Sequence, residues 1–380
     1  MKATGFKPED AAAIEAVAST GGLIMPPVMG AVAFLIAEFL GISYGKLVIY
    51  AFPAAIMYFS AVFAAAHWKA RKAGLSGLPK EQLPSFGKVL KQGWYLALPL
   101  VALVVLLIMD YSVSRAAFVA IFGMLLLSFI RKETRMSPLT IVSVLSQTTR
   151  NAVVVSSTLL LTGLIVGVVQ ISGIGLTISV IAMKLTGGSL VIGLLLGAVI
   201  AFILGLPLPA LVVYIYGAIF IIPTLIDLGA NPLAAHMFFL YYAFAGGLTP
   251  PVCITAYTAA SIAGAPMLKT GWTATRLGYT LYLLPFLFVF NPAILLQEFT
   301  WASVPSLLFG FIGIIIITAG IEGYFLRRRS PLERTWLIVT GLSLLSGSIW
   351  SWGLYIGLGL LALLVLEQTI RERKTRKRVT

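Results

Sequence analysis

Two short stretches of the sequence combine paired glycines with paired prolines inside otherwise apolar surroundings. They read Thr20-Gly-Gly-Leu-Ile-Met-Pro-Pro-Val28 and Ala245-Gly-Gly-Leu-Thr-Pro-Pro-Val-Cys253, and the second has one residue fewer between its glycines and its prolines. Proline lacks an N–H donor and its ring clashes with the preceding helical turn, whereas glycine adopts backbone angles that other residues avoid. Each stretch therefore predicts an interrupted helix, with backbone carbonyl oxygens that have no helical partner.

Interrupted helices in apolar sequence are typical of ion and substrate sites. Unwound backbone survives in hydrocarbon only where protein or a water-lined cavity satisfies its polar groups. Paired interruptions in two halves of a membrane protein are the best sequence indication of a transporter site. Peptide oxygens and hydroxyls suit a hard cation, and the positive N-terminal ends of half-helices suit a carboxylate. Two ordinary proline kinks are the alternative.

The composition is that of a polytopic membrane protein. Of 380 residues, 59% are hydrophobic and 11% are charged, whereas a soluble domain carries about 25% charged residues. The net charge of +14 comes from basic residues in short loops and the tail, so membrane topology explains it better than nucleic-acid binding. The single cysteine, Cys253, excludes an internal disulfide and a cysteine-rich metal site.

The apolar segments predict a chain of four parts. The first holds one broken helix and one further span, the second is a basic cytoplasmic loop, the third contains a hairpin and the second broken helix, and the last consists of accessory helices and a basic tail. In order, these parts are residues 1–66, 67–92, 93–296 (with the hairpin at 188–226 and the broken helix at 233–263) and 297–380.

The hairpin is predicted to be re-entrant. The arms on either side of Gly205-Leu-Pro-Leu-Pro209 are short for full crossings, which take about 20 residues. Two full crossings joined by a tight turn are the alternative. With residues 67–92 in the cytoplasm, the other basic segments fall on the same side, and the expected outer loops 227–232 and 291–303 contain no lysine or arginine. Both hairpin arrangements satisfy this topology.

Charged residues at span ends favour structural over catalytic roles. Arg150 and Arg276 are expected to snorkel, Glu38 to serve structure or an interface, and Glu322 receives no role. Intramembrane enzymes need nucleophiles, paired acids or metal ligands inside their spans. Both histidines lie in or beside loops, and the aspartates of the outer turns lie outside the spans. The sequence therefore does not favour an enzyme.

The segment Glu15-Ala-Val-Ala-Ser-Thr-Gly-Gly-Leu-Ile-Met-Pro-Pro-Val-Met-Gly30 resembles the large (DctM-like) membrane subunit of TRAP transporters, in particular the TAXI-type fused permeases. Gly205-Leu-Pro207, Asn231-Pro-Leu-Ala-Ala-His236 and Leu248-Thr-Pro-Pro251 match in the same order, and the likeness runs to about residue 296. It implies an all-α polytopic membrane fold with inverted repeats, broken helices and a re-entrant hairpin, as in elevator-type ion transporters.

The resemblance implies a permease subunit in the cell inner membrane. A sodium gradient would drive uptake of an organic acid delivered by a secreted solute-binding protein, with sodium as coupling ion and no other cofactor. The family's first hairpin and preceding helices are missing, so the chain is expected to lack its N-terminal part. A separate chain or fused segment would then supply that half and the small membrane subunit. Membrane lipid is an expected partner, and nucleic acid is not. A non-transporting scaffold or truncated remnant is the alternative.

The resemblance and the interrupted helices together nominate residues for binding sodium and substrate. Hydroxyl groups among them have an alternative role, because serine and threonine in helices often bond to their own backbone carbonyls. The candidates are Ser19, Thr20, Gly21, Gly22, Pro26 and Pro27 at the first interruption, Gly205, Leu206 and Pro207 at the hairpin tip, and Gly246, Gly247, Thr249, Pro250, Pro251 and Thr255 at the second interruption.

Overall fold

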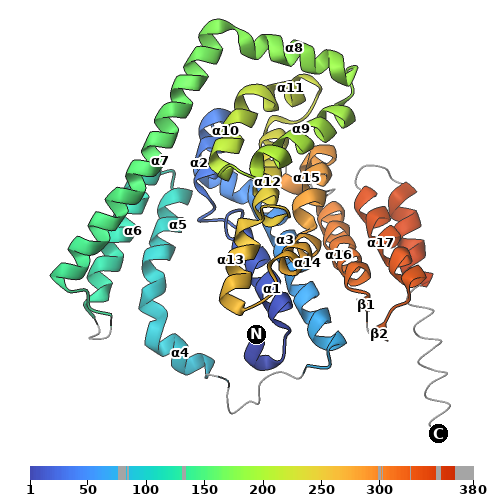
Figure 1. The fold of residues 1–380 in the computed structure, drawn as a ribbon, viewed down its shortest axis with the longest axis horizontal. Coiled ribbons are helices and arrows are strands. Elements are labelled where there is room, and N and C mark those ends of the chain that lie inside the picture. The colour runs from blue at the N-terminus through green and yellow to red at the C-terminus, as the bar shows by residue number, and fades with distance from the viewer. Residues whose placement is uncertain are drawn as a thin grey trace.

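The computed structural model shows an almost entirely helical protein (Figure 1). Its one exception among the described residues is a strand pair of two residues each, β1 (Tyr324–Phe325) and β2 (Arg327–Arg328). The residues that the structure describes are 1–75, 83, 85–130, 134–297, 301, 303–325, 327–347 and 352–363. The all-α fold class that the family resemblance implied is confirmed.

The helices follow the chain in three groups. The first group is α1 (Pro8–Gly21), α2 (Ala31–Leu40) and α3 (Tyr44–Lys72), preceded by a 3₁₀ turn at Lys2–Thr4. The second is α4 (Phe86–Gly93), α5 (Leu98–Ile108), α6 (Val113–Ser128), α7 (Pro138–Ser172) and α8 (Ile174–Thr186), with a 3₁₀ turn at Trp94–Ala97 before α5. The third is α9 (Leu190–Gly205), α10 (Ala210–Phe220), α11 (Ile222–Asp227), α12 (Pro232–Leu248), α13 (Ile254–Ala263), α14 (Met267–Leu277), α15 (Thr280–Phe290), a 3₁₀ turn at Pro292–Leu295, α16 (Ser303–Glu322), α17 (Pro331–Ser346) and Trp352–Leu363.

Helix α12 is the centre of the bundle. Nearly all of its residues are buried, and it packs against α9, α10 and α15. A helix that is apolar on every side is expected to lie inside the protein. Asn231 caps its start: the Asn231 side chain accepts a 3.2 Å hydrogen bond from the Ala234 N–H, and Pro232 occupies the first turn, where no N–H partner is needed. The cap fixes where α12 begins, and the helix then runs through the core to Leu248, directly before the second interruption.

The remaining helices pack around α12 and its neighbours, with α5 to α8 on one side and α16 and α17 on the other (Figure 1). Helices α5 and α6 pack as a pair, and the long α7 meets the bundle through α10. Gly173, with φ of 67°, separates α7 from α8, because this left-handed conformation ends a helix at little cost only for glycine. On the opposite side α16 packs against both α3 and α17, and the strand pair connects α16 to α17.

Several element bounds differ from the sequence prediction. Residues 138–172 form one continuous helix, so Arg150, which was expected at the end of a span, lies within a helix. Helix α3 runs through Lys72 and α4 begins at Phe86, so the basic loop is shorter than 67–92. Residues 131–133, which include Arg131 and Lys132, and the tail 371–380 lie outside the described residues.

The apolar helices fall into two classes by length: those long enough to cross a membrane and shorter ones. Among the described residues, three stretches are long and apolar enough to cross a membrane: Tyr44–Lys72, Met267–Phe290 and Ser303–Glu322. The other apolar helices are shorter, including both arms of the hairpin and three of the four halves of the broken helices, α2, α12 and α13. Re-entrance of the hairpin agrees with these lengths and stays a prediction, as does the division of the chain into four parts.

Candidate ion and substrate site

The first interruption lies between α1 and α2, where residues 22–30 leave the helical conformation. The carbonyl oxygens of Ser19, Thr20 and Gly21 accept turn hydrogen bonds from the N–H groups three or four residues later. Farther along, the Tyr44 hydroxyl lies 3.0 Å from the carbonyl oxygens of both Pro27 and Val28. The unwound backbone is thus satisfied by protein groups, as an apolar interior requires.

The hydroxyls at the first interruption already have partners. Thr20 is buried and donates a 2.9 Å hydrogen bond to the Ala16 carbonyl oxygen, which is the alternative anticipated for a helical threonine. Ser19 Oγ donates to Glu15 Oε1 at 3.3 Å. A hydroxyl that donates keeps two lone pairs, so cation ligation by either side chain stays a prediction.

The second interruption joins α12 to α13 through residues 249–253. Thr249 is 7% exposed, and its hydroxyl donates a 2.7 Å hydrogen bond to the Ala245 carbonyl oxygen while also contacting the Tyr282 hydroxyl. Tyr257 donates to the Pro251 carbonyl oxygen at 3.2 Å. Because the donor proton of Thr249 points to Ala245, the Tyr282 hydroxyl is the donor in their contact, and one lone pair of the Thr249 oxygen remains free.

The hairpin tip meets the second interruption through two glycines. A Cβ built on Gly246 would lie 2.4 Å from the carbonyl carbon of Gly205 and 2.7 Å from its Cα. The two main chains therefore touch with no side chain between them, which only glycine permits. The next glycine, Gly247, faces Thr255, whose Oγ1 would lie 3.9 Å from a Cβ built there. Hairpin tip, interruption and the first turn of α13 thus converge.

A second contact ties the hairpin to α12. The Tyr214 hydroxyl of α10 and His236 Nδ1 of α12 lie 2.6 Å apart, and both side chains are buried. Phe39, near the end of α2, stacks on the His236 ring. Since a histidine ring nitrogen can donate or accept according to its tautomer, this bond holds the two helices together in either arrangement. Its role in the structure is packing.

The two interrupted helices cross in an antiparallel sense. The half before the first interruption, α1, packs on α13, which follows the second; the half after the first, α2, packs on α12, which precedes the second. A Cβ on Gly30 would lie 3.6 Å from Phe244, which places the end of the first interruption against α12. This exchange of partners is the arrangement expected of inverted repeats.

Sequence reasoning missed the tyrosines that line these helices. Tyr58 donates a 2.7 Å hydrogen bond to the Val17 carbonyl oxygen, and Tyr242 donates to the Tyr282 carbonyl oxygen at 3.0 Å. Tyr241 is fully buried and its hydroxyl has no hydrogen-bond partner within the part of the chain that the structure describes. Tyrosine within an apolar helix is itself a signal, because a buried phenol needs a polar partner.

The candidate residues offer only neutral donors: peptide oxygens and the hydroxyls of Ser19, Thr20, Thr249 and Thr255. Within the described ranges, no three histidine, cysteine, aspartate or glutamate side chains gather closely enough to hold a metal ion. Neutral oxygens suit a hard cation of low charge, since a divalent ion is held chiefly by carboxylates. The chemistry of this donor set therefore fits sodium better than calcium or zinc.

Comparison with known proteins identifies the family of the chain. The family model for the DctM component of the tripartite ATP-independent periplasmic transporters matches residues 1–302. No curated protein matches the chain in sequence. The family match includes both interruptions and the hairpin, and it ends before α16 begins. The chain belongs to the DctM family, the large membrane component of tripartite ATP-independent periplasmic transporters.

Proposed function

We propose that this permease subunit uses a sodium gradient to drive uptake of an organic acid. The observation that carries the proposal is the convergence of the hairpin tip with the second interruption, where the main chains of Gly205 and Gly246 touch beside Thr249. Such a junction brings peptide oxygens of two elements within reach of one cation. The family supplies the transport function; the ion and the substrate class are inferred from the donor chemistry.

Sodium would bind where neutral oxygens meet. Thr249 would contribute the free lone pair of its hydroxyl, and the carbonyl oxygens around Gly205, Leu206 and Gly246 would complete the shell. The corresponding set at the first interruption is Ser19 to Gly22. Because Gly246 packs directly on Gly205, a cation held there would fix the hairpin against α12. Ion binding would thus stabilise one relative position of the two elements.

The organic acid would bind at the ends of the half-helices that follow the interruptions. Helices α2 and α13 begin at Ala31 and Ile254, after the proline pairs, and their first N–H groups carry positive partial charge. Thr255 lies in the first turn of α13 and adds a hydroxyl donor. A carboxylate suits this pair of half-helix ends, because each offers several N–H groups without requiring a buried cationic side chain.

The proposal also names the surroundings of the subunit. A secreted solute-binding protein would deliver the acid, and a small membrane subunit would accompany the permease. The subunit would lie in the inner membrane as a TAXI-type permease. A non-transporting scaffold is the competing assignment, and it predicts that sodium has no specific effect on the protein.

Replacement of Thr249 by valine is expected to weaken sodium binding by roughly 1.4 kcal/mol, because one oxygen ligand is lost. The sodium concentration that gives half of the maximal thermal stabilisation should then rise about tenfold. The measurement is the melting temperature of the purified chain in sodium against potassium at equal ionic strength. Sodium-driven uptake by the assembled system in proteoliposomes should shift in parallel.

The matched control is Thr258→Val. Thr258 lies on α13 and donates a 2.9 Å hydrogen bond to the Ile254 carbonyl oxygen, the same local bond that Thr249 makes to Ala245. Its replacement should leave the sodium dependence unchanged. If Thr249→Val shows the wild-type sodium response, Thr249 is not a ligand; if the unmodified chain shows no sodium-specific stabilisation, the scaffold assignment holds instead.

A further inference from the structure

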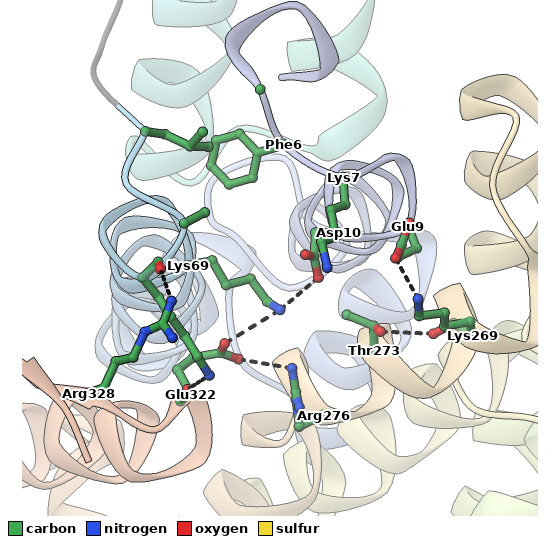
Figure 2. Close-up of a pocket in the computed structure, with 14 residues that line it drawn as sticks. Phe6, Lys7, Glu9, Asp10, Lys69, Lys269, Thr273, Arg276, Glu322 and Arg328 are labelled. Atoms are coloured by element: carbon green, nitrogen blue, oxygen red, sulfur yellow. Dashed lines mark hydrogen bonds and ion pairs between the residues drawn. The ribbon is translucent and has the colours of Figure 1, made fainter.

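A charged cavity opens at the end of the bundle where α1 begins and α3 ends. Its volume is 660 Å³, within the range of about 300–1,000 Å³ that is usual for small-molecule sites. Its walls come from the N-terminal segment, α1, α3, α14, the end of α16 and β2 (Figure 2). It lies apart from both interruptions in the sequence, and none of the candidate sodium or substrate residues lines it.

Cationic side chains outnumber acidic ones in the cavity wall. The cations are Lys7, Lys69, Lys72, Lys269, Arg276 and Arg328, and the acids are Glu9, Asp10 and Glu322, which leaves a surplus of three positive charges. These residues come from segments that are far apart in the chain. The fold therefore gathers these cationic side chains around a single cavity instead of leaving them on separate surface loops.

Each acid is already paired within the wall. Glu9 Oε1 lies 2.7 Å from Lys269 Nζ, and Asp10 Oδ1 lies 2.7 Å from Lys69 Nζ. The hydrogen bond from Lys269 holds the pKa of Glu9 below its usual value, so Glu9 stays ionised and keeps its lysine. Figure 2 shows these pairs on the α1 side of the cavity.

Glu322 is the third acid, and its side chain is 2% exposed. It lies 3.5 Å from Lys69 and 3.7 Å from Arg276, and its position holds both cations in the wall. Its main-chain carbonyl oxygen accepts a 2.8 Å hydrogen bond from Lys72 Nζ. Glu322 therefore balances the charge of Lys69 and Arg276 inside the wall. Because its carboxylate is buried, it reduces the positive potential at the opening of the cavity only a little.

The surplus falls on Lys7, Lys72 and Arg328. Within the described residues, no carboxylate lies within ion-pair distance of these three side chains. Arg328 Nη2 donates to the Lys72 carbonyl oxygen at 3.2 Å, which places its guanidinium beside the end of α3. Backbone carbonyl oxygens orient the head groups of Lys72 and Arg328 but do not neutralise them.

We propose that this cavity binds a phosphate-bearing anion. A phosphate group carries up to two negative charges and several acceptor oxygens, which matches a surplus of cations that approach from several sides. A monovalent carboxylate would leave most of that surplus uncompensated. The phosphate belongs either to a free anion or to a phosphomonoester lipid headgroup such as that of phosphatidic acid, and both can carry two negative charges and share the same recognition chemistry.

The first arm of the test uses inorganic phosphate. Equilibrium binding of radiolabelled phosphate to the purified full-length chain in detergent should be saturable at fixed ionic strength. The double variant Lys72→Gln, Arg328→Gln should weaken phosphate binding about a hundredfold, about one decade for each of the two charge-assisted contacts removed. Lys7→Gln, at an exposed position, should weaken it as well, and it keeps the test valid if the double variant does not fold.

The matched control is Arg71→Gln. Arg71 lies at the same end of α3 and carries the same charge, but it is absent from the cavity wall. The second arm compares nanodiscs of phosphatidylcholine with and without phosphatidic acid. A rise in melting temperature with phosphatidic acid that the double variant loses, without saturable binding of free phosphate, identifies a lipid headgroup.

Saturable phosphate binding that depends on Lys72 and Arg328 identifies a free anion. The proposal is overturned if neither arm shows an effect, or if Arg71→Gln lowers the effect as much as the double variant does. In that last case the response reflects the overall positive charge of this end of the bundle. Sodium plays no part in either arm, so the outcome is independent of the transport proposal.

Discussion

Replacement of Gly246 by alanine is expected to separate the hairpin from α12 and to abolish transport. The added Cβ would lie 2.4 Å from the Gly205 carbonyl carbon, 2.6 Å from its oxygen and 2.7 Å from its Cα. All three obstacles are main-chain atoms of a helix end, so no side-chain rotation relieves the overlap. The hairpin or α12 must move as a unit.

The expected loss of stability is about 2 kcal/mol or more. Overpacking in a core costs about 1–3 kcal/mol when side chains can give way, and a main-chain obstacle belongs at the upper end. Alanine gains about 1 kcal/mol over glycine in a helix interior, which offsets part of this cost. The functional effect should be larger than the effect on stability, because the displaced elements are those that would share the cation.

Gly247→Ala is the matched control for this prediction. Gly247 is the next residue of the same helix, and the nearest atom to a Cβ built there is Thr255 Oγ1 at 3.9 Å, an ordinary contact. This variant should melt at the wild-type temperature or slightly above it. Thermal unfolding in detergent compares the two, and equal melting temperatures would show that Gly205 and Gly246 do not touch.

The sequence was sufficient to predict the fold class and the positions of both interruptions. Paired glycines and prolines act locally on the helical conformation, so the breaks at residues 22–30 and 249–253 follow from their own sequences. The turn at Asp110 and the glycine break at Gly173 also follow from local signals. The continuous helix α7 was not predicted: Arg150 was expected at the end of a span, whereas the helix continues past it to Ser172.

The partners of the candidate residues were harder to predict. The approach of Gly205 to Gly246 and the contact of Thr249 with Tyr282 join segments that are distant in the chain, and no local pattern encodes such pairs. Glu322 illustrates the same limit. It lies at the end of an apolar helix and gave no functional signal, yet its carboxylate is buried between Lys69 and Arg276.

Replacement of Lys69 by methionine is expected to destabilise the protein by about 3–5 kcal/mol, the cost of removing one partner from a buried ion pair. The Lys69 side chain is 9% exposed, and its Nζ serves two carboxylates, Asp10 at 2.7 Å and Glu322 at 3.5 Å. Without it, Glu322 would keep only the 3.7 Å contact with Arg276, a side chain that is 48% exposed. The cationic link between α1 and the end of α16 would then be lost.

Two further variants separate this mechanism from a general loss of charge. Arg71→Met removes an exposed cation two residues away and should change stability by no more than about 0.5 kcal/mol. Combining Lys69→Met with Asp10→Asn and Glu322→Gln removes the stranded charges and should recover most of the loss. Chemical denaturation in detergent measures all three. Failure of the triple variant to recover would mean that Lys69 acts through the packing of its aliphatic stem, and the charge network would then not be what holds α16 to the transporter core.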